Sequence, residues 1–152
     1  MSDQFFRDHA VAVMQKLMLK FDLKAYMAAG IMGNLGHESG GLIQLREIGQ
    51  PQGRGGYGWA QWTGPRARKF LAWCDQSGLD WKGVDGNLGY LIHELDNDNQ
   101  TISALLKTKD VLSATVSFER NYERAGVVNM NARLKWADIA YSTWTSHFAK
   151  IA

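Results

Sequence analysis

The feature that most constrains the fold of this chain is an apolar repeat at helical spacing. The repeat runs through most of the 152 residues and is interrupted once. In each helical stretch, apolar side chains recur three or four positions apart, so that they share one face. The interruption, residues 42–64, is rich in glycine and aromatic residues and lacks this period. A chain of this kind must pack several helices together and accommodate one irregular segment.

The repeat also predicts where the helices lie. The first expected helix follows Asp3, and the second begins near Asp22 and ends at the glycines at positions 40 and 41. Further helices are expected from Pro65 to Gly78, from Asp85 to about residue 95, around residues 102–106, from Asp110 to Gly126 and from Met130 to Phe148. Short extended pieces such as Tyr57–Trp62 are expected within the interruption. The predicted architecture is therefore a mainly α single domain over residues 1–152, with a small extended or β-hairpin-like insertion after the second helix.

Composition excludes several classes of protein. The net charge is only +2 and no block of Lys and Arg occurs, which argues against nucleic acid as a partner. Cys74 is the only cysteine, so no intrachain disulfide can form. The sequence contains no stretch of roughly 18 apolar residues, so we expect no stable membrane insertion. The N-terminus lacks the apolar core of a signal peptide. No metal-ligand spacing occurs, and we expect no cofactor and a monomer.

Glu38 stands in an unusual position near the end of the second expected helix. The helix dipole disfavours a negative charge there. Glu38 nevertheless continues the apolar stripe of Ile31 and Leu35. A carboxyl group among apolar neighbours loses hydration, which favours its protonated form. A protonated carboxyl near neutral pH can donate a proton to a leaving oxygen, as glycosidases require.

The sequence "GYGWAQW" supplies residue types that bind sugars. Aromatic rings stack on the apolar faces of sugars, and amides bind the hydroxyl groups at the edges. In a strand, Tyr57, Trp59 and Gln61 would share one face, while Trp62 would lie on the other. The sequence leaves open which face lines a cleft. We expect at least one of the rings of Trp59 and Trp62 to be exposed there.

Three motifs in this order carry a family resemblance: "IMGNLGHESGG", "GYGWAQWTGPRARKF" and "FERNYERAG". Together they resemble the phage lysozyme-like muralytic enzymes, which include tail-associated lysozymes and some endolysins. The resemblance covers about residues 24–145, and the middle motif is the most specific of the three. It implies an α+β lysozyme-like fold related to goose-type lysozyme and the soluble lytic transglycosylases.

The resemblance also implies roles for individual residues. Glu38 takes the place of the catalytic acid, and Ser39 follows it as in the transglycosylase-like "ES" motif. "GYGWAQW" looks like the family's "GYGLAQW", which makes Tyr57 and Gln61 candidates for substrate contact. "NYERAG" resembles a pattern in which "FERP" is common, although Tyr122 replaces the phenylalanine and alanine replaces the proline.

Two acids, Glu123 and Glu47, remain open between two interpretations. Glu123 either borders the cleft beside Tyr122 or belongs, like Glu119, to a solvated helix face. Glu47 is the candidate for a second catalytic carboxylate. In the other interpretation it is a loop acid that pairs with Arg46 or Arg54.

The resemblance implies that bacterial peptidoglycan is the substrate, cleaved at the β-1,4 bond between N-acetylmuramic acid and N-acetylglucosamine. A second carboxylate that activates water would give hydrolysis, whereas attack by the muramyl 6-hydroxyl would give a 1,6-anhydro product. A phage endolysin would be made in the host cytoplasm and reach the periplasmic wall after release; a virion tail component is the alternative. Outside catalysis, the alternatives are a peptidoglycan-binding module and a helical interaction protein.

Overall fold

The computed structural model describes residues 2–47, 49–51 and 54–151, and confirms the mainly helical prediction. The helices of this part of the chain are α1 (Gln4–Phe21), α2 (Ala25–Ser39), α3 (Gly64–Ser77), α4 (Val84–Asp96), α5 (Asn99–Leu106), α6 (Val111–Phe118), the π-helical turn η1 (Glu119–Glu123) and α7 (Met130–Ile151). None of these helices is both long and apolar enough to cross a bilayer.

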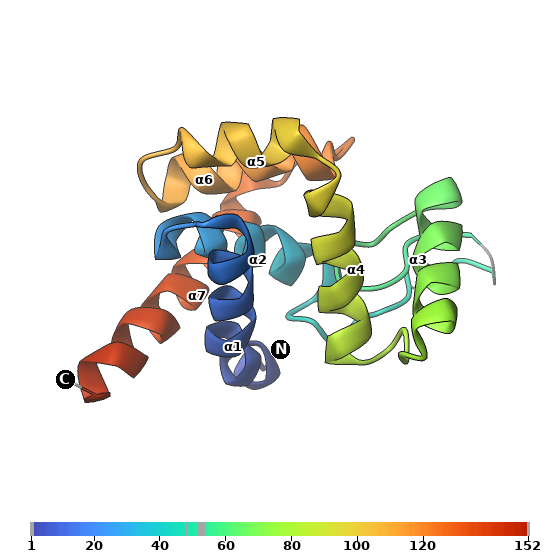
Figure 1. The fold of residues 1–152 in the computed structure, drawn as a ribbon, viewed down its shortest axis with the longest axis horizontal. Helices are drawn as coiled ribbons and strands as arrows, with labels where there is room; N and C mark the ends of the chain where they lie inside the picture. The colour runs from blue at the N-terminus through green and yellow to red at the C-terminus, as the bar shows by residue number, and fades with distance from the viewer. Residues whose placement is uncertain (1, 48, 52–53, 152) are drawn as a thin grey trace.

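Helix α2 is the central element. It packs most extensively against α7 and α6, and α5 and α6 lie on one side of it while α1 and α7 lie on the other (Figure 1). Two glycines allow this close approach. A Cβ atom at Gly33 would lie 2.5 Å from the Cβ of Ala137, and one at Gly30 would lie 2.7 Å from the backbone carbon of Ala114. The neighbouring helices therefore pack directly on the backbone of α2.

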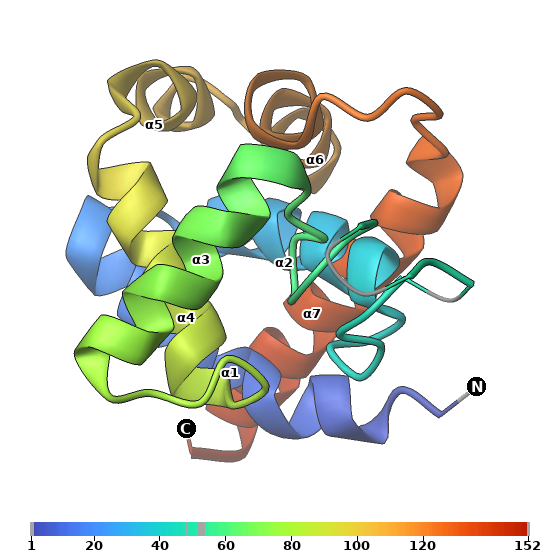
Figure 2. The same cartoon turned by 90° about the vertical axis from the view of Figure 1, so that its right-hand side faces the viewer.

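Helices α3 and α4 lie at the end of the molecule away from the C-terminus of α7 (Figure 1). An aromatic cluster joins them to the glycine-rich segment: the ring centroid of Trp62 lies 4.5 Å from that of Phe70 and 5.1 Å from that of Tyr90. Asn87 of α4 also accepts a hydrogen bond from the backbone N–H of Trp59, at 2.9 Å. Figure 2 shows the segment, in teal, beside α3. These contacts fix it next to the C-terminal end of α2.

The predicted β-hairpin-like insertion is wrong. The described residues contain isolated bridges between Arg46 and Tyr57 and between Tyr57 and Trp62, but no strand. Gly58 and Gln61 have positive φ angles of 76° and 53°, which curl the chain tightly between Tyr57 and Trp62. An alternation of side chains with period two cannot persist through such a turn. From Tyr57 to Trp62 the chain forms a compact loop, which one pair of backbone hydrogen bonds between these two residues closes.

The predicted end of one helix also differs from the structure. Asp110 caps α6 as predicted, through a capping box with Ser113. The helix was expected to continue regularly to Gly126. Instead, α6 passes into the π-helical turn η1 after Phe118, and the chain leaves that turn at Arg124 with a φ of 49°. This widened turn determines where Glu123 lies.

Candidate active site

Glu38 is the next-to-last residue of α2, and its side chain is 19% exposed. Its Oε1 accepts a hydrogen bond of 2.7 Å from Nη2 of Arg133 on α7, whose side chain is only 1% exposed. The apolar stripe therefore describes only part of the surroundings of Glu38. The structure adds a buried guanidinium group that pairs with the carboxylate.

The guanidinium of Arg133 is held by more than Glu38. It donates to Oδ1 of Asn34 at 3.0 Å and to the carbonyl of Val128 at 2.6 Å. Asn34 in turn donates to the carbonyls of Gly30 and Thr115. This chain of contacts links α2, α6 and α7 and fixes the direction from which Arg133 meets the carboxylate.

Sequence reasoning missed Arg133 and Asn34, although both gave a signal. Asn34 interrupts the run of apolar and small residues along α2, and Arg133 lies one helical turn before the buried Ala137. A polar side chain at a core position requires partners. Each position therefore indicated that a polar partner was needed, without indicating which residue supplies it.

Two pockets meet at Glu38. One, of about 380 Å³, extends towards η1 and α7. The other, of about 330 Å³, extends towards the glycine-rich segment. We call their union the Glu38 cleft. The residues that line both pockets are His37, Glu38, Gln61 and Thr63.

Glu123 lines the same cleft on the side of η1. Its Oε1 is buried and has no hydrogen-bond partner among the described residues. Burial raises the pKa of Glu123 well above its ordinary value, and the negative charge of Glu38 raises this pKa further. Of the two interpretations from sequence, the position beside the cleft is the one observed. Both effects favour the neutral form of its carboxyl, which lies in the same cleft as the paired Glu38.

Glu119 was predicted to lie on a solvated helix face, and that prediction is wrong. Its side chain is buried, and its Oε2 accepts a hydrogen bond of 2.9 Å from the backbone N–H of Ala125. The backbone carbonyl of Glu119 also accepts from the N–H of Arg124. The first residue of η1 thus closes the turn that carries Glu123, and π-helical turns of this kind frequently occur at functional sites.

Glu47 borders the opposite end of the Glu38 cleft. Its Oε2 accepts a hydrogen bond of 2.9 Å from the backbone N–H of Gly56. The predicted pairing with an arginine is not formed among the described residues. Arg46 instead donates to backbone carbonyls of the loop, and its guanidinium lies 4.0 Å from the centre of the Tyr57 ring.

The expected exposure of a tryptophan ring is wrong. Trp59 and Trp62 are each 1% exposed. Trp62 packs in the aromatic cluster between α3 and α4, and Trp59 is fixed by Asn87. Tyr57 is also buried, beneath Arg46. Because the tight turn directs these large rings into the core, they build the wall of the cleft from behind.

Gln61 lines both pockets of the cleft. Its amide donates to the carbonyl of Gly58 at 2.8 Å. Ser39, by contrast, is buried: its Oγ donates to the carbonyl of Leu35 and accepts from the N–H of Leu42. The structure thus places Ser39 at the end of α2 as a backbone cap, outside the cleft lining.

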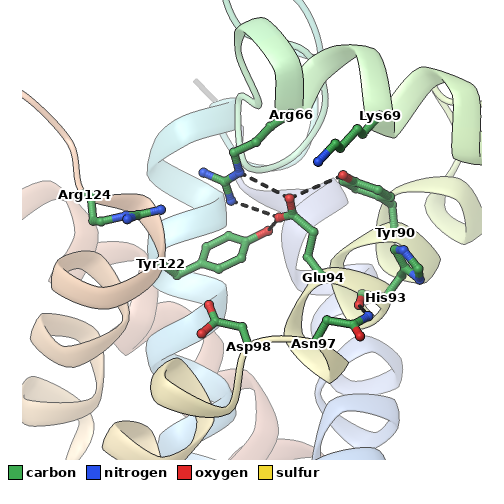
Figure 3. A pocket seen from close by; sticks show the side chains of 9 residues that line it. All are labelled: Arg66, Lys69, Tyr90, His93, Glu94, Asn97, Asp98, Tyr122 and Arg124. Atoms are coloured by element: carbon green, nitrogen blue, oxygen red, sulfur yellow. Dashed lines mark hydrogen bonds and ion pairs between the residues drawn. The ribbon is translucent and has the colours of Figure 1, made fainter.

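Tyr122 lies behind the cleft in a second network, which centres on Glu94 of α4 (Figure 3). The phenol of Tyr122 is buried and donates to Oε1 of Glu94. The other donors to Glu94 are Trp62, Tyr90 and the Nε and Nη2 of Arg66. Burial alone would raise the pKa of Glu94, but these hydrogen bonds and the charge of Arg66 outweigh it, so its pKa lies below the ordinary value. No motif or spacing in the sequence singles out Glu94.

His37 lines both pockets beside Glu38. Burial lowers the pKa of His37, and the positive charge of Arg133 lowers it further, against the opposing effect of Glu38. The net effect favours the neutral imidazole. Within the part of the chain that the structure describes, no three His, Cys, Asp or Glu side chains are placed to hold a metal ion.

Comparison with known families finds a match over most of the chain. The model of a family described as phage tail lysozyme matches residues 8–144 of the chain. The match confirms the resemblance inferred from the three motifs and extends it into α1. It also includes both residues of the pair of Glu38 and Arg133.

Proposed function

This chain belongs to the phage tail lysozyme family, and from that premise we propose that it is a glycosidase that degrades bacterial peptidoglycan. The bond cleaved is the β-1,4 bond between N-acetylmuramic acid and N-acetylglucosamine, and Glu38 is the general acid. The observation that carries the proposal is the place of Glu38. Its carboxyl is partly exposed where two pockets meet, so a glycan strand lying in the cleft would pass directly over it.

The contrast with Glu123 supports Glu38 as the proton donor. A general acid must come within hydrogen-bond distance of the oxygen that it protonates. The Oε1 of Glu123 is buried, whereas Glu38 is open to the cleft. The negative charge of Glu38 is one cause of the raised pKa of Glu123, so the two carboxyls interact electrostatically. Glu123 is therefore a positioning residue behind Glu38, and Glu38 is the group that faces the glycosidic oxygen.

Two routes can complete the reaction. In the first, a second carboxylate activates water and the product carries a reducing end; Glu47 is the candidate, since it borders the cleft on the side opposite Glu123. In the second, the muramyl 6-hydroxyl attacks internally and leaves a 1,6-anhydro end, which requires no second carboxylate. Mass spectrometry of the released muropeptides distinguishes the two routes.

The central experiment compares the wild-type chain with Glu38→Gln. Turbidity of permeabilised Gram-negative cells measures cleavage, and co-sedimentation with purified sacculi measures binding. We expect clearing to fall by about 10²–10⁴-fold, the range typical of a lost general acid, with binding retained. Asp75→Asn, a surface change on α3, is the matched control and should clear at the wild-type rate.

The same experiment tests the rival proposal, a peptidoglycan-binding module without catalysis. That protein would bind sacculi and clear no cells with or without Glu38. Clearing that persists undiminished in Glu38→Gln would remove the assignment of the acid. As for location, we propose that the chain acts on the periplasmic wall. It would reach the wall either after release from the host cytoplasm or as part of a virion tail, and immunodetection on purified virions separates these two cases.

A further inference from the structure

A second pocket adjoins the Glu38 cleft. It has a volume of about 390 Å³ and lies between α3, α4, the start of α5 and η1 (Figure 3). Arg66 and Arg124 line both this pocket and the Glu38 cleft. The two spaces therefore adjoin each other at these two arginines.

The floor of the pocket is the pair of Glu94 and Arg66. Every oxygen of Glu94 already has donors: Oε1 accepts from Trp62, Arg66 and Tyr122, and Oε2 accepts from Arg66 and Tyr90. A carboxylate with its acceptor sites so occupied offers little to a cation or to a sugar hydroxyl. The floor is a neutral, fixed surface that does not itself attract a charged ligand.

The rim carries the charge that a ligand would meet. Lys69 and Arg124 are exposed, and their side chains form no hydrogen bond or ion pair with the described residues. Figure 3 shows both cationic ends directed towards the Arg66–Glu94 pair from opposite sides. The remaining acid, Asp98, accepts hydrogen bonds from the N–H and Oγ1 of Thr101 at the start of α5. Two cations without partners thus face an open space.

The type of ligand follows from these charges. The rings of Tyr90 and Tyr122 are buried, so the pocket offers little aromatic surface for a sugar face. Two separated cations favour an anionic group instead. In peptidoglycan, the carboxylates belong to the short peptide stems that branch from the muramic acid residues. We propose that this pocket binds a stem carboxylate of the sugar next to the cleaved bond; the inference rests on the proposed function.

The test uses two forms of one substrate: native sacculi, and sacculi whose free carboxyls have been converted to amides with carbodiimide and ammonia. The full chain and the double variant Lys69→Ala/Arg124→Ala are compared by co-sedimentation. Wild-type binding should fall about five-fold on amidation, within the range for two exposed ion pairs. The double variant should bind native sacculi about five-fold more weakly than wild type and be insensitive to amidation.

The matched control, Arg68→Ala/Lys107→Ala, removes the same charge from exposed positions outside the pocket and should keep the preference for native sacculi. Equal binding of wild type to both forms, or an equal loss by both double variants, overturns the inference. Cell clearing is recorded separately. If the chain prefers native sacculi but clears no cells, the proposed carboxylate pocket stands and the proposed glycosidase activity fails. If the chain clears cells but binds both forms of sacculi equally, the glycosidase activity stands and the pocket fails.

Discussion

Two glutamate–arginine pairs can be compared directly. The side chain of Glu38 is 19% exposed and that of Glu94 is 18% exposed, and each pairs with an arginine from another helix. Their hydrogen bonding differs sharply. Glu94 accepts from four side chains, whereas the described residues provide Glu38 with one donor, Arg133.

The two carboxylates are thus equally exposed but differ in how many of their acceptor sites remain free. The acceptor sites of Glu94 are occupied, which holds α3, α4 and η1 together and commits the group to structure. Glu38 keeps free acceptor sites on the side that faces the cleft. For a buried carboxylate, the number of donors that it has already engaged indicates its role better than burial does.

Among substitutions at these two pairs, Arg133→Met should cause the largest loss in the free energy of unfolding. The substitution removes the partner of Glu38 and leaves Oδ1 of Asn34 unpaired inside the protein. Breaking a buried pair on one side costs about 3 kcal/mol of unfolding free energy. Urea denaturation measures the loss. Arg7→Met, which breaks an exposed pair with Asp3, is the control and should cost less than about 1 kcal/mol. A similar small cost for both would show that the pair at Glu38 is only a surface contact.

The second prediction concerns Glu94→Gln. Because Arg66 is about one-third exposed, solvent screening lowers the expected loss to about 2 kcal/mol at pH 7. The pKa of Glu94 is lowered in the folded state, so its contribution is complete above the ordinary value of 4.5 and is lost as pH falls through the lower folded pKa. The stability gap between wild type and variant should therefore narrow in acid. A gap that stays constant down to pH 2 contradicts this account.

The smallest change in stability is expected for Glu123→Gln. Unlike the two preceding substitutions, it should stabilise the protein near pH 7. The pKa of Glu123 is raised in the folded state, so wild type loses stability as pH rises above the ordinary value of 4.5. Glutamine does not titrate. The variant should therefore gain about 1 kcal/mol on wild type near pH 7, or a Tm rise of about 3 °C, and gain nothing at pH 4.

Glu38 offers an internal check on that result. Its negative charge is the second cause of the raised pKa of Glu123. In a Glu38→Gln background, the gain from Glu123→Gln near pH 7 should shrink. Thermal melts of the four combinations at pH 4 and pH 7 measure the coupling between the two carboxyls. If the stability effects of the two substitutions were strictly additive, the two carboxyls would not interact.

The sequence predicted the helices well because their period is local. Each inward face, such as Phe6 to Leu17 on α1, depends only on neighbours within one helix. The glycine-rich loop was predicted poorly for the complementary reason. The same residues fit a strand by alternation, and the positive φ of Gln61 could not be anticipated from its residue type.

In the candidate site, too, the local features were predicted from the sequence and the long-range contacts were not. The position of Glu38 on the inner stripe of α2 and the order of the three motifs came from the sequence, and the family match confirms the resemblance that they carry. The partner of Glu38 could not be predicted from the sequence, because Arg133 is 95 positions away and meets Glu38 only through the packing of α7 on α2. The burial of Trp59 and Trp62 likewise depends on α3 and α4.

By itself, the sequence determined which residues form helices, which face of each turns inward, and that an acid ends the stripe of α2. Only the tertiary structure decided that Glu38 is paired, that the Oε1 of Glu123 is buried without a partner among the described residues, and that every oxygen of Glu94 accepts hydrogen bonds. The reason is physical. Periodicity is encoded by residues one turn apart, whereas the environment of a carboxyl is set by whichever distant segments fold against it.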